Sequence, residues 1–326
     1  MLLALAAAPQ VQAQALRGVN LSGAEFGPEK LPGRPGHDYV YPTDAQFEWA
    51  AAMRFTVIRL PILWERLQPG LFRPLDPPEL ARLQAAVAAA DQRGIATIID
   101  VHNYGGYRGH MIGSPETPLS AFTDLWRRLA EAFRKDPHAI FGLMNEPKDF
   151  APETWLPVAQ AAVTVIRQTG ARNLVLVPGA GWDGAHDFTT GHGTGPSNAE
   201  ALAALHDPAS QLAFEVHQYL DADYSGTHPD CPAAPRAAGL LEPFTAWLRA
   251  GHRRGFLGEF AVSNRPECLI GLTRMLDHMV ANSDVWAGWT AWGGGAWWHA
   301  DYPFIIEPRD GTEAPQTAVL RNRGSR

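Results

Sequence analysis

The sequence predicts a single (β/α)8 barrel with its functional residues at the carboxyl ends of the strands. Eight short apolar segments alternate with segments in which apolar residues recur at helical spacing. No composition break or internal repeat divides the 326 residues, a length sufficient for one large barrel. A doubly wound sheet would also alternate, but no glycine-rich nucleotide-binding motif follows the first apolar segment.

The predicted strands of the first half of the chain lie at 16–21, 55–61, 95–101 and 139–144, and the second of them is β-branched and ends at a proline. A helix that Thr43 can cap runs to Met53, and the next follows Asp76-Pro77-Pro78 and closes at Gly94. A third apolar stripe at helical spacing covers 122–133.

The second half continues the same alternation. Predicted strands lie at 173–177, 212–216, 255–260 and 286–291. Helical stripes cover 155–166 and 269–279, and the tail beyond Pro308 is expected to be a final helix or a loose end. No linker or second module interrupts this order, so residues 16–326 are predicted to form one catalytic domain.

The first fifteen residues predict a signal peptide. Residues 2–8 are an apolar run of leucine and alanine, and Ala13-Gln14-Ala15 fits a cleavage site. A charged segment before the apolar run is missing, which indicates that the start is either truncated or misassigned. No stretch is long enough to span a bilayer. The protein is therefore expected to be secreted, to the periplasm or the extracellular space.

The two cysteines, Cys231 and Cys268, leave two alternatives open. In an exported protein an even pair indicates one disulfide, whereas in a cytosolic protein it indicates two separate thiols. A disulfide here would close a loop of 37 positions and add roughly 3–4 kcal/mol.

The composition is that of a globular protein that does not bind polyanions. Hydrophobic residues make up 46% of the chain, charged residues 19%, and the formal net charge is −7. Nucleic acid and anionic membranes are therefore not expected partners. The 11 tryptophans offer possible stacking faces for sugar rings, although core packing is the default role of each.

Polar and aromatic residues gather where the predicted strands end. Barrel closure would bring these exits into one bowl. An isolated histidine at a strand end usually only forms a structural hydrogen bond. Polar residues at the ends of so many strands, however, predict a functional site. Its members are Asn20, Arg59, His102, Asn145, Glu146, His217, Tyr219, Glu259 and Trp292.

Two of these residues, Glu146 and Glu259, predict glycoside hydrolysis. That reaction needs one protonated carboxyl for the leaving oxygen and one ionised carboxylate to attack the anomeric carbon. Arg59 and Tyr219 are expected to hold Glu259 ionised by charge and hydrogen bonding. Asn145 is placed to bind a sugar 2-hydroxyl, and Trp292 offers a stacking face for a ring.

These motifs resemble glycoside hydrolase family 5, the cellulase family, over nearly the whole chain after the signal. The resemblance depends on residues 59–61, 100–104, 144–147, 217–221 and 258–259. It is greatest for fungal and bacterial endoglucanases with Phe-Gly-x-Met-Asn-Glu-Pro and His-Gln-Tyr-Leu-Asp-x-Asp-x-Ser-Gly-Thr. Here these segments occupy 141–147 and 217–227.

The resemblance implies a role for each matching residue. Glu146 corresponds to the acid/base and Glu259 to the nucleophile, with Trp292 as the platform beside the cleaved bond. It also implies a disulfide between Cys231 and Cys268. The supporting residues it implies are Arg59, His102, Asn145, His217 and Tyr219.

One segment departs from those endoglucanases. They often have Glu-Thr-Gly-Gly-Gly after the seventh strand, where this chain has Glu259-Phe260-Ala261-Val262-Ser263. The shape of the cleft beside the nucleophile is therefore open. Two loops are equally compatible with a sugar subsite and with core packing, the one with Trp64 and the one with Trp182, Asp183 and His186. Trp297-Trp298 either extend the platform of Trp292 or pack under it.

The leading hypothesis is a retaining endo-β-1,4-glucanase that acts on soluble or amorphous β-glucan polysaccharides or oligosaccharides. It would form a covalent glycosyl-enzyme, need no metal or cofactor, and act as a monomer. Mannan, xyloglucan and mixed-linkage glucan are alternative substrates. Other classes are a metal-dependent barrel hydrolase that uses His102 and His217, and a sugar-binding barrel without catalysis.

Overall fold

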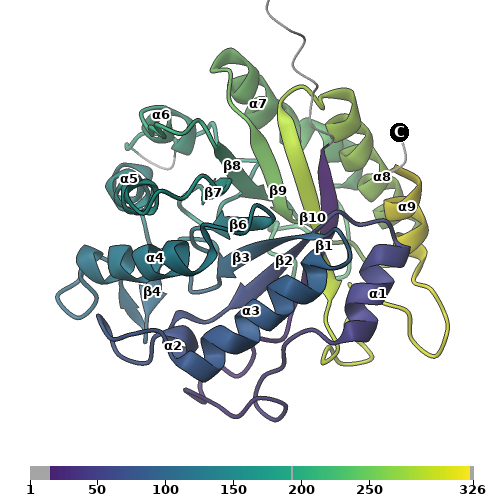
Figure 1. Cartoon of the computed structure of the whole chain (residues 1–326). Coiled ribbons are helices and arrows are strands. Elements are labelled where there is room, and N and C mark those ends of the chain that lie inside the picture. Colours follow the sequence, from purple (N-terminus) through teal and green to yellow (C-terminus); the bar gives the residue numbers. More distant parts are fainter. Residues whose placement is uncertain (1–14, 192–193, 324–326) are drawn as a thin grey trace, which may run out of the picture.

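Parallel strands pair edge to edge into a closed barrel, as the sequence predicts (Figure 1). The computed structural model describes residues 15–191 and 194–323, so the predicted signal peptide lies outside the described residues except for Ala15. Around the barrel the strands run in the order β1-β10-β9-β8-β7-β6-β3-β2. Their bounds are β1 (Leu16–Leu21), β2 (Val57–Ile62), β3 (Ala96–Val101), β6 (Ala139–Gly142), β7 (Val175–Pro178), β8 (Leu212–His217), β9 (Gly255–Glu259) and β10 (Trp286–Gly294).

Helices surround the barrel (Figure 1). They are α1 (Asp44–Ala52), α2 (Trp64–Leu67), α3 (Pro77–Asp91), α4 (Leu119–Phe133), α5 (Pro152–Gln168), α6 (Asn198–Leu202), the 3₁₀ helix η1 (Ala234–Arg236), α7 (Ala237–Ala250), α8 (Pro266–Ala281) and α9 (Pro315–Arg323). A small hairpin joins β4 (Gly106–Tyr107) to β5 (His110–Met111). None of the helices in the described part of the chain is both long and apolar enough to cross a membrane.

Local sequence explains where the helices begin and which faces they bury. Asp76 accepts a hydrogen bond from the Glu79 backbone N–H at 3.0 Å, and prolines begin α3. The predicted apolar stripe of α4 is buried against the barrel. Helix α7 was not predicted, although its buried residues Leu240, Leu241, Phe244 and Leu248 recur at helical spacing.

The barrel interior changes from apolar to charged along the strands. Its lower layer consists of Val57, Ile98, Ile140, Leu176, Ala213, Phe256 and Ala287. Two residues further along three of these strands, on the same inward face, lie Arg59, Asp100 and Glu215, all fully buried. The charged layer therefore forms the floor on which the strand exits stand.

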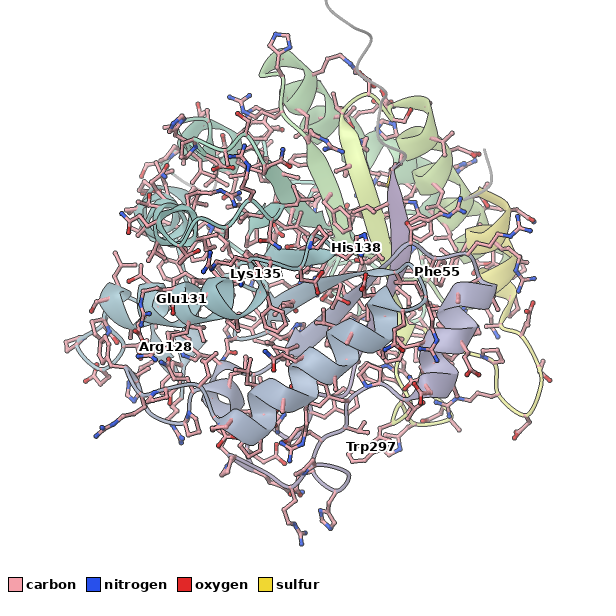
Figure 2. The ribbon with its side chains drawn as sticks, in the orientation of Figure 1. Phe55, Arg128, Glu131, Lys135, His138 and Trp297 are labelled. Carbon is pink, nitrogen blue, oxygen red and sulfur yellow. A yellow bond between two sulfur atoms is a disulfide. The ribbon has the colours of Figure 1, made fainter. Side chains whose placement is uncertain are left out.

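The two ends of the barrel have different surroundings. In Figure 2, Arg128 and Glu131 lie along α4, and Lys135 and His138 lie in the turn that leads into β6. Trp297 lies in the loop that follows β10. Because the strands are parallel, the loops after them all open at the end that carries Trp297 and the predicted site.

The predicted disulfide is confirmed. Cys231 and Cys268 are bonded, with their Cα atoms 5.3 Å apart, and join the segment before η1 to the first turn of α8. Replacing both cysteines by alanine is expected to lower the free energy of unfolding by about 3–4 kcal/mol, because the closed loop restricts the unfolded chain. Urea unfolding of the oxidised protein and of the variant would measure this difference. Reducing the wild-type protein should give a similar loss, and an unchanged midpoint in both would contradict the prediction.

Candidate active site

The predicted site residues lie in or directly after seven of the barrel strands, and a buried arginine lies at their centre. Arg59 in β2 donates from Nη1 to Glu259 Oε1 at 2.7 Å, and from Nη2 to Asn145 Oδ1 at 2.9 Å. Its Nε donates to Glu215 Oε1 at 3.0 Å, and its Nη1 lies 3.1 Å from Asp100 Oδ2. Burial alone would lower the pKa of Arg59, but the surrounding carboxylates raise it above its ordinary value. The guanidinium is therefore a fixed positive charge.

Glu259, the last residue of β9, is held at both carboxylate oxygens. Arg59 occupies Oε1, and the Tyr219 hydroxyl donates to Oε2 at 2.9 Å. Glu259 is only 4% exposed. Burial, followed by the charge of Glu259, raises the pKa of Tyr219 well above its ordinary value, so the phenol stays a donor. Two donors on one carboxylate form the arrangement expected around an ionised group.

Glu146 follows β6 and faces Glu259. A carboxylate oxygen of each, together with a ring nitrogen of His217, lie within 4.8 Å of one another. His217 Nδ1 lies 2.8 Å from Glu146 Oε1 and 3.7 Å from Glu259 Oε2. The φ angle of Glu146 is 40°, in the left-handed region that costs a non-glycine residue energy. Such strain is typical of residues whose position is fixed by function.

His217 lies between carboxylates on every side. Burial alone would lower its pKa, but Glu259, Glu146 and Glu215 raise it well above its ordinary value. The cationic form is therefore favoured. His217 thus lies between the paired glutamates, Glu146 and Glu259, and Glu215 in the charged layer. Its Nε2 is 3.7 Å from Glu215 Oε1.

An aromatic wall flanks the paired glutamates. His102 Nδ1 lies 2.7 Å from Asp100 Oδ2, and the His102 ring stacks on Trp292 with centroids 5.7 Å apart and planes inclined by 16°. The Tyr104 hydroxyl is 3.3 Å from His102 Nε2. Trp292 is partly exposed and donates from its indole to the Tyr302 hydroxyl at 2.9 Å. Its ring is thus fixed at the edge of the site.

Two asparagines among the predicted residues occupy different levels. Asn20 is fully buried, accepts from Arg59, and donates to the backbone oxygens of Gly258 and Thr290. It lies beneath the site and supports Arg59. Asn145 also accepts from Arg59, which leaves its Nδ2 as the donor for the space beside Glu146.

The other tryptophans that the sequence left ambiguous have different surroundings. Trp64 is fully buried and packs against Tyr107 and Phe122, so its interpretation as a sugar subsite is wrong. Trp182 is 54% exposed, and Lys148 Nζ lies 5.2 Å from its ring centroid. Trp298 stacks on Tyr302 and contacts Trp292 edge to face, with ring centroids 5.9 Å apart.

Asp183 and His186, the other two residues of the loop with Trp182, are not exposed in the way that a sugar-binding surface requires. Asp183 is fully buried and accepts from the Gly179 N–H. His186 is partly buried, with its ring over that of Tyr224 at 4.1 Å. For Asp183 the subsite interpretation is therefore wrong, and the buried carboxylate shapes the turn after β7.

Sequence reasoning missed two residues of the site. Glu215 was treated only as part of an apolar strand, and Asp100 only as part of a family motif. Both ion-pair with Arg59 in the charged layer. The available signal was the same one that identified Arg59, because a lone charge inside a buried strand implies a partner of opposite charge.

Gly258 shows how tightly the charged layer is packed. A Cβ at this position would lie 2.0 Å from Glu215 Oε1 and 2.8 Å from its carboxyl carbon. Gly258→Ala is therefore expected to lower the free energy of unfolding by about 1–3 kcal/mol, the usual cost of overpacking, and to reduce activity by displacing Glu215. Chemical denaturation and initial rates would measure both effects.

Gly239 in α7 is the matched control, because a Cβ there meets nothing within 4 Å. Gly239→Ala is expected to stabilise the protein by about 0.4–1 kcal/mol. Equal effects of the two substitutions would contradict the packing argument.

Three groups of side chains in the described ranges could hold a metal ion by distance alone. One, formed by Glu146, His217 and Glu259, lies in the site. It does not contain His102, the other histidine that a metal-dependent hydrolase was expected to use. Glu259 is already paired with Arg59, so a metal would compete with a fixed cation.

The chain is similar to known proteins over almost its full length. A family model described as "Cellulase (glycosyl hydrolase family 5)" matches residues 19–295. Endo-beta-1,4-glucanase B of Emericella nidulans is 35% identical over 309 residues, which cover 94% of this chain and 90% of the relative.

Solved structures agree with this match. A crystal structure of the endo-beta-1,4-glucanase Xac0029 from Xanthomonas axonopodis pv. citri is 48% identical, with a TM-score of 0.92, and covers 95% of this chain and 98% of its own. A structure of XacCel5A in complex with cellopentaose is also 48% identical, with a TM-score of 0.93, and covers 95% of this chain and 99% of its own.

Proposed function

Because the chain belongs to the cellulase family, glycosyl hydrolase family 5, and is a glycoside hydrolase, we propose that it is a retaining endo-β-1,4-glucanase. One observation carries the mechanism. Carboxylate oxygens of Glu146 and Glu259 lie within 4.8 Å of each other, across the open end of the barrel. Retaining enzymes have carboxyl groups about 5–5.5 Å apart, whereas inverting enzymes need about 6.5–9.5 Å to admit a water molecule.

The environments of the two glutamates support different roles. Glu259, with Arg59 and Tyr219 on its oxygens, attacks the anomeric carbon as a carboxylate. Glu146, in its protonated form, gives its proton to the oxygen of the departing sugar. The bond from the anomeric carbon to that oxygen breaks as the bond to Glu259 forms.

The second step reverses these roles. Glu146, now a carboxylate, takes a proton from water, and the water oxygen displaces Glu259 from the anomeric carbon. Both displacements invert the anomeric centre, so the product keeps the configuration of the substrate. The free Nδ2 of Asn145 is placed to bind the 2-hydroxyl, and Trp292 to stack on the ring that reacts.

The substrate that we propose is a soluble or amorphous β-1,4-glucan. The similar proteins are named as endoglucanases, and one was solved with cellopentaose bound. Xyloglucan, mannan and mixed-linkage glucan remain alternatives, since the loops around the site set that choice. The exposed Trp182 is proposed as a further sugar contact beside Glu146.

We also propose that the protein is secreted and monomeric, and that it needs no cofactor. The apolar run before Ala13-Gln14-Ala15 and the disulfide support export to an oxidising compartment. Sequencing the amino terminus of the exported protein would test the first point, because cleavage after Ala15 leaves Leu16 first. A dimer mass in light scattering would refute the second.

The function is tested with the purified protein on carboxymethyl-cellulose, mixed-linkage glucan, xyloglucan and mannan, with and without EDTA. We expect cleavage of glucan to be fastest, to be unaffected by EDTA, and to release products of retained configuration. Faster cleavage of mannan or xyloglucan would overturn only the substrate. Loss of activity in EDTA would favour the metal-dependent hydrolase, and binding without cleavage would favour the sugar-binding barrel.

A further inference from the structure

The turn that follows β7 contacts both chain segments that carry the proposed acid and its histidine. Strand β7 lies between β6 and β8 in the barrel, so the turn after it adjoins the exits of both neighbours (Figure 1). Glu146 follows β6, and His217 is the last residue of β8. The turn consists of residues 179–185, and its bonds to both sides are made by the backbone.

Three backbone hydrogen bonds join this turn to the two segments. The Gly181 N–H donates to the backbone oxygen of Pro147 at 3.0 Å. The His217 N–H donates to the backbone oxygen of Asp183 at 2.7 Å, and the Ala185 N–H donates to that of His217 at 2.9 Å. One turn therefore fixes both backbone groups of His217 and the residue directly after the proposed acid.

Asp183 closes the turn with its side chain. The residue is fully buried, and its Oδ1 accepts from the Gly179 N–H. The φ angle is 57° at Asp183 and 73° at Trp182, in the left-handed region that costs a residue other than glycine energy. Aspartate and asparagine tolerate this region better than most residues, because their short polar side chains can form local hydrogen bonds. The bond to Gly179 therefore stabilises a backbone that would otherwise be strained.

Asp183 uses only one of its two carboxyl oxygens. Its Oδ2 is buried and has no hydrogen-bond partner within residues 15–191 and 194–323. Burial raises the pKa of Asp183 well above its ordinary value, although the charge of His217 opposes this shift. The side chain therefore acts as a neutral acid that accepts one backbone hydrogen bond. An asparagine has the same shape and provides the same acceptor, so it is the conservative replacement.

A second side chain fixes the start of the turn. Asn198, the first residue of α6, accepts from the Ala180 N–H at 2.8 Å and donates to the Ala180 oxygen at 2.9 Å. The start of the turn is thus held from α6, independently of Asp183. Loss of the Asp183 side chain is therefore expected to shift the residues that bind His217 without unfolding the whole loop.

We propose that Asp183 is a positioning residue for Glu146: it fixes the turn that holds Pro147 and His217, and thereby sets the place from which Glu146 transfers its proton. The proposal rests on the proposed glycoside hydrolase function and assigns Asp183 no contact with the substrate. His217 Nδ1 lies 2.8 Å from Glu146 Oε1, so a shift of His217 reaches the acid directly. Misplacing a catalytic group by about 1 Å can lower a rate about 10²-fold.

The nucleophile is fixed by other parts of the barrel. Glu259 ends β9, and Arg59 of β2 donates to its Oε1 at 2.7 Å. Changes in the turn after β7 should therefore spare the attack on the anomeric carbon. They should affect the two steps that need Glu146, which are proton donation to the leaving oxygen and activation of water.

The test compares phenyl β-cellobioside with 2,4-dinitrophenyl β-cellobioside, which differ only in the leaving group. Phenolate needs a proton from Glu146 to depart, whereas dinitrophenolate does not. In Asp183→Ala, kcat/KM is expected to fall about 10- to 100-fold for the phenyl substrate and to change little for the dinitrophenyl substrate. For the dinitrophenyl substrate kcat should fall, because hydrolysis of the glycosyl-enzyme needs Glu146. KM should then fall together with kcat.

Asp207→Ala is the matched control. Asp207 accepts from the backbone N–H groups of Ala209 and Gln211 and pairs with Arg167, and its side chain is 3% exposed. It precedes β8 and so lies at the opposite end of the barrel from the site. Its loss should lower the melting temperature but should not make kcat/KM depend more strongly on the leaving group.

Two further variants separate the hydrogen bond from the shape of the side chain. Asp183→Asn keeps an acceptor for the Gly179 N–H, so the selective loss should be much smaller than in Asp183→Ala. Asp183→Leu has the shape of aspartate but no acceptor, and it should show the selective loss without leaving a cavity. Melting temperatures of all variants measure general destabilisation.

The outcomes separate this proposal from the one on which it rests. Equal losses on both substrates in Asp183→Ala and Asp183→Leu, no loss in either variant, or failure of both to fold would overturn the positioning role and leave the glycoside hydrolase function intact. A selective loss in Asp207→Ala would also contradict that role. A wild-type protein inert on both substrates would overturn the proposed function itself.

Discussion

Replacing Glu259 by alanine is expected to lower kcat on glucan by at least about 10³-fold, the scale on which key catalytic groups act. The substitution removes the carboxylate that Arg59 and Tyr219 orient toward the anomeric carbon. KM should change much less, because Glu259 is 4% exposed and offers little surface for ground-state binding. Initial rates on carboxymethyl-cellulose and on 2,4-dinitrophenyl β-cellobioside measure both quantities.

The same variant allows a test that loss of structure could not mimic. Azide is small enough to occupy the space left by the carboxylate and is itself a nucleophile. One displacement by azide inverts the anomeric centre, so the rescued product should be a glycosyl azide of configuration opposite to the substrate. Nuclear magnetic resonance of the product gives the configuration. Rescue with retention, or an active variant without azide, would refute Glu259 as nucleophile.

Glu146→Ala is expected to lose at least about 10³-fold on polysaccharide but far less in the first step with a 2,4-dinitrophenyl leaving group. A sugar alkoxide needs a proton to depart, whereas dinitrophenolate does not. Formation of the glycosyl-enzyme should therefore remain fast while its hydrolysis slows, because Glu146 also activates water. A burst of dinitrophenolate, of one equivalent per enzyme, is the expected signature.

Glu131→Ala is a suitable control for this experiment. Glu131 lies on α4, pairs with Arg127, and takes no part in the contacts of the paired glutamates. It should show neither the loss nor the burst. An equal loss by Glu146→Ala on polysaccharide and on the activated substrate would show that Glu146 is not the proton donor.

The fold was predictable because its pattern repeats. Each strand is an apolar run of the same kind, and most end in polar or aromatic residues, so an error at one boundary does not alter the topology. The strand that begins at Ala139 is two residues shorter than expected. Leu143 and Met144 are fully buried and apolar, like strand residues, but they follow the last residue that pairs with β3. Helix α7 escaped prediction although its apolar residues recur at helical spacing.

The site was predictable only at the level that the strand exits reveal. The pairing of Arg59 with Glu259 followed from one charge in a strand and one carboxylate at an exit. The charged layer below the site could not be predicted in the same way. The sequence does not tell which inward-facing residues of different strands lie in the same layer of the barrel. Trp64 was ambiguous for the same reason, since an indole is equally suited to a core and to a sugar.

Asp183 belongs to a third category. It lies in a turn rich in glycine, where a carboxylate is ordinarily exposed. Its position depends on the pairing of that turn with His217, a residue some thirty positions further along. Contacts of this kind are specific to one three-dimensional arrangement and leave no periodic signature in the chain.

The way in which the site is assembled has a consequence for folding. Asn20 in the first strand donates to the backbone of Gly258, a separation of 238 residues, and Arg59 reaches Glu259 across 200. Strands β1 and β10 must pair before these bonds exist. Long-range pairings of this kind form slowly, because much chain entropy is lost before contacts compensate. Recovery of catalysis during refolding therefore reports closure of the barrel, and a chain still emerging from the ribosome has no functioning centre.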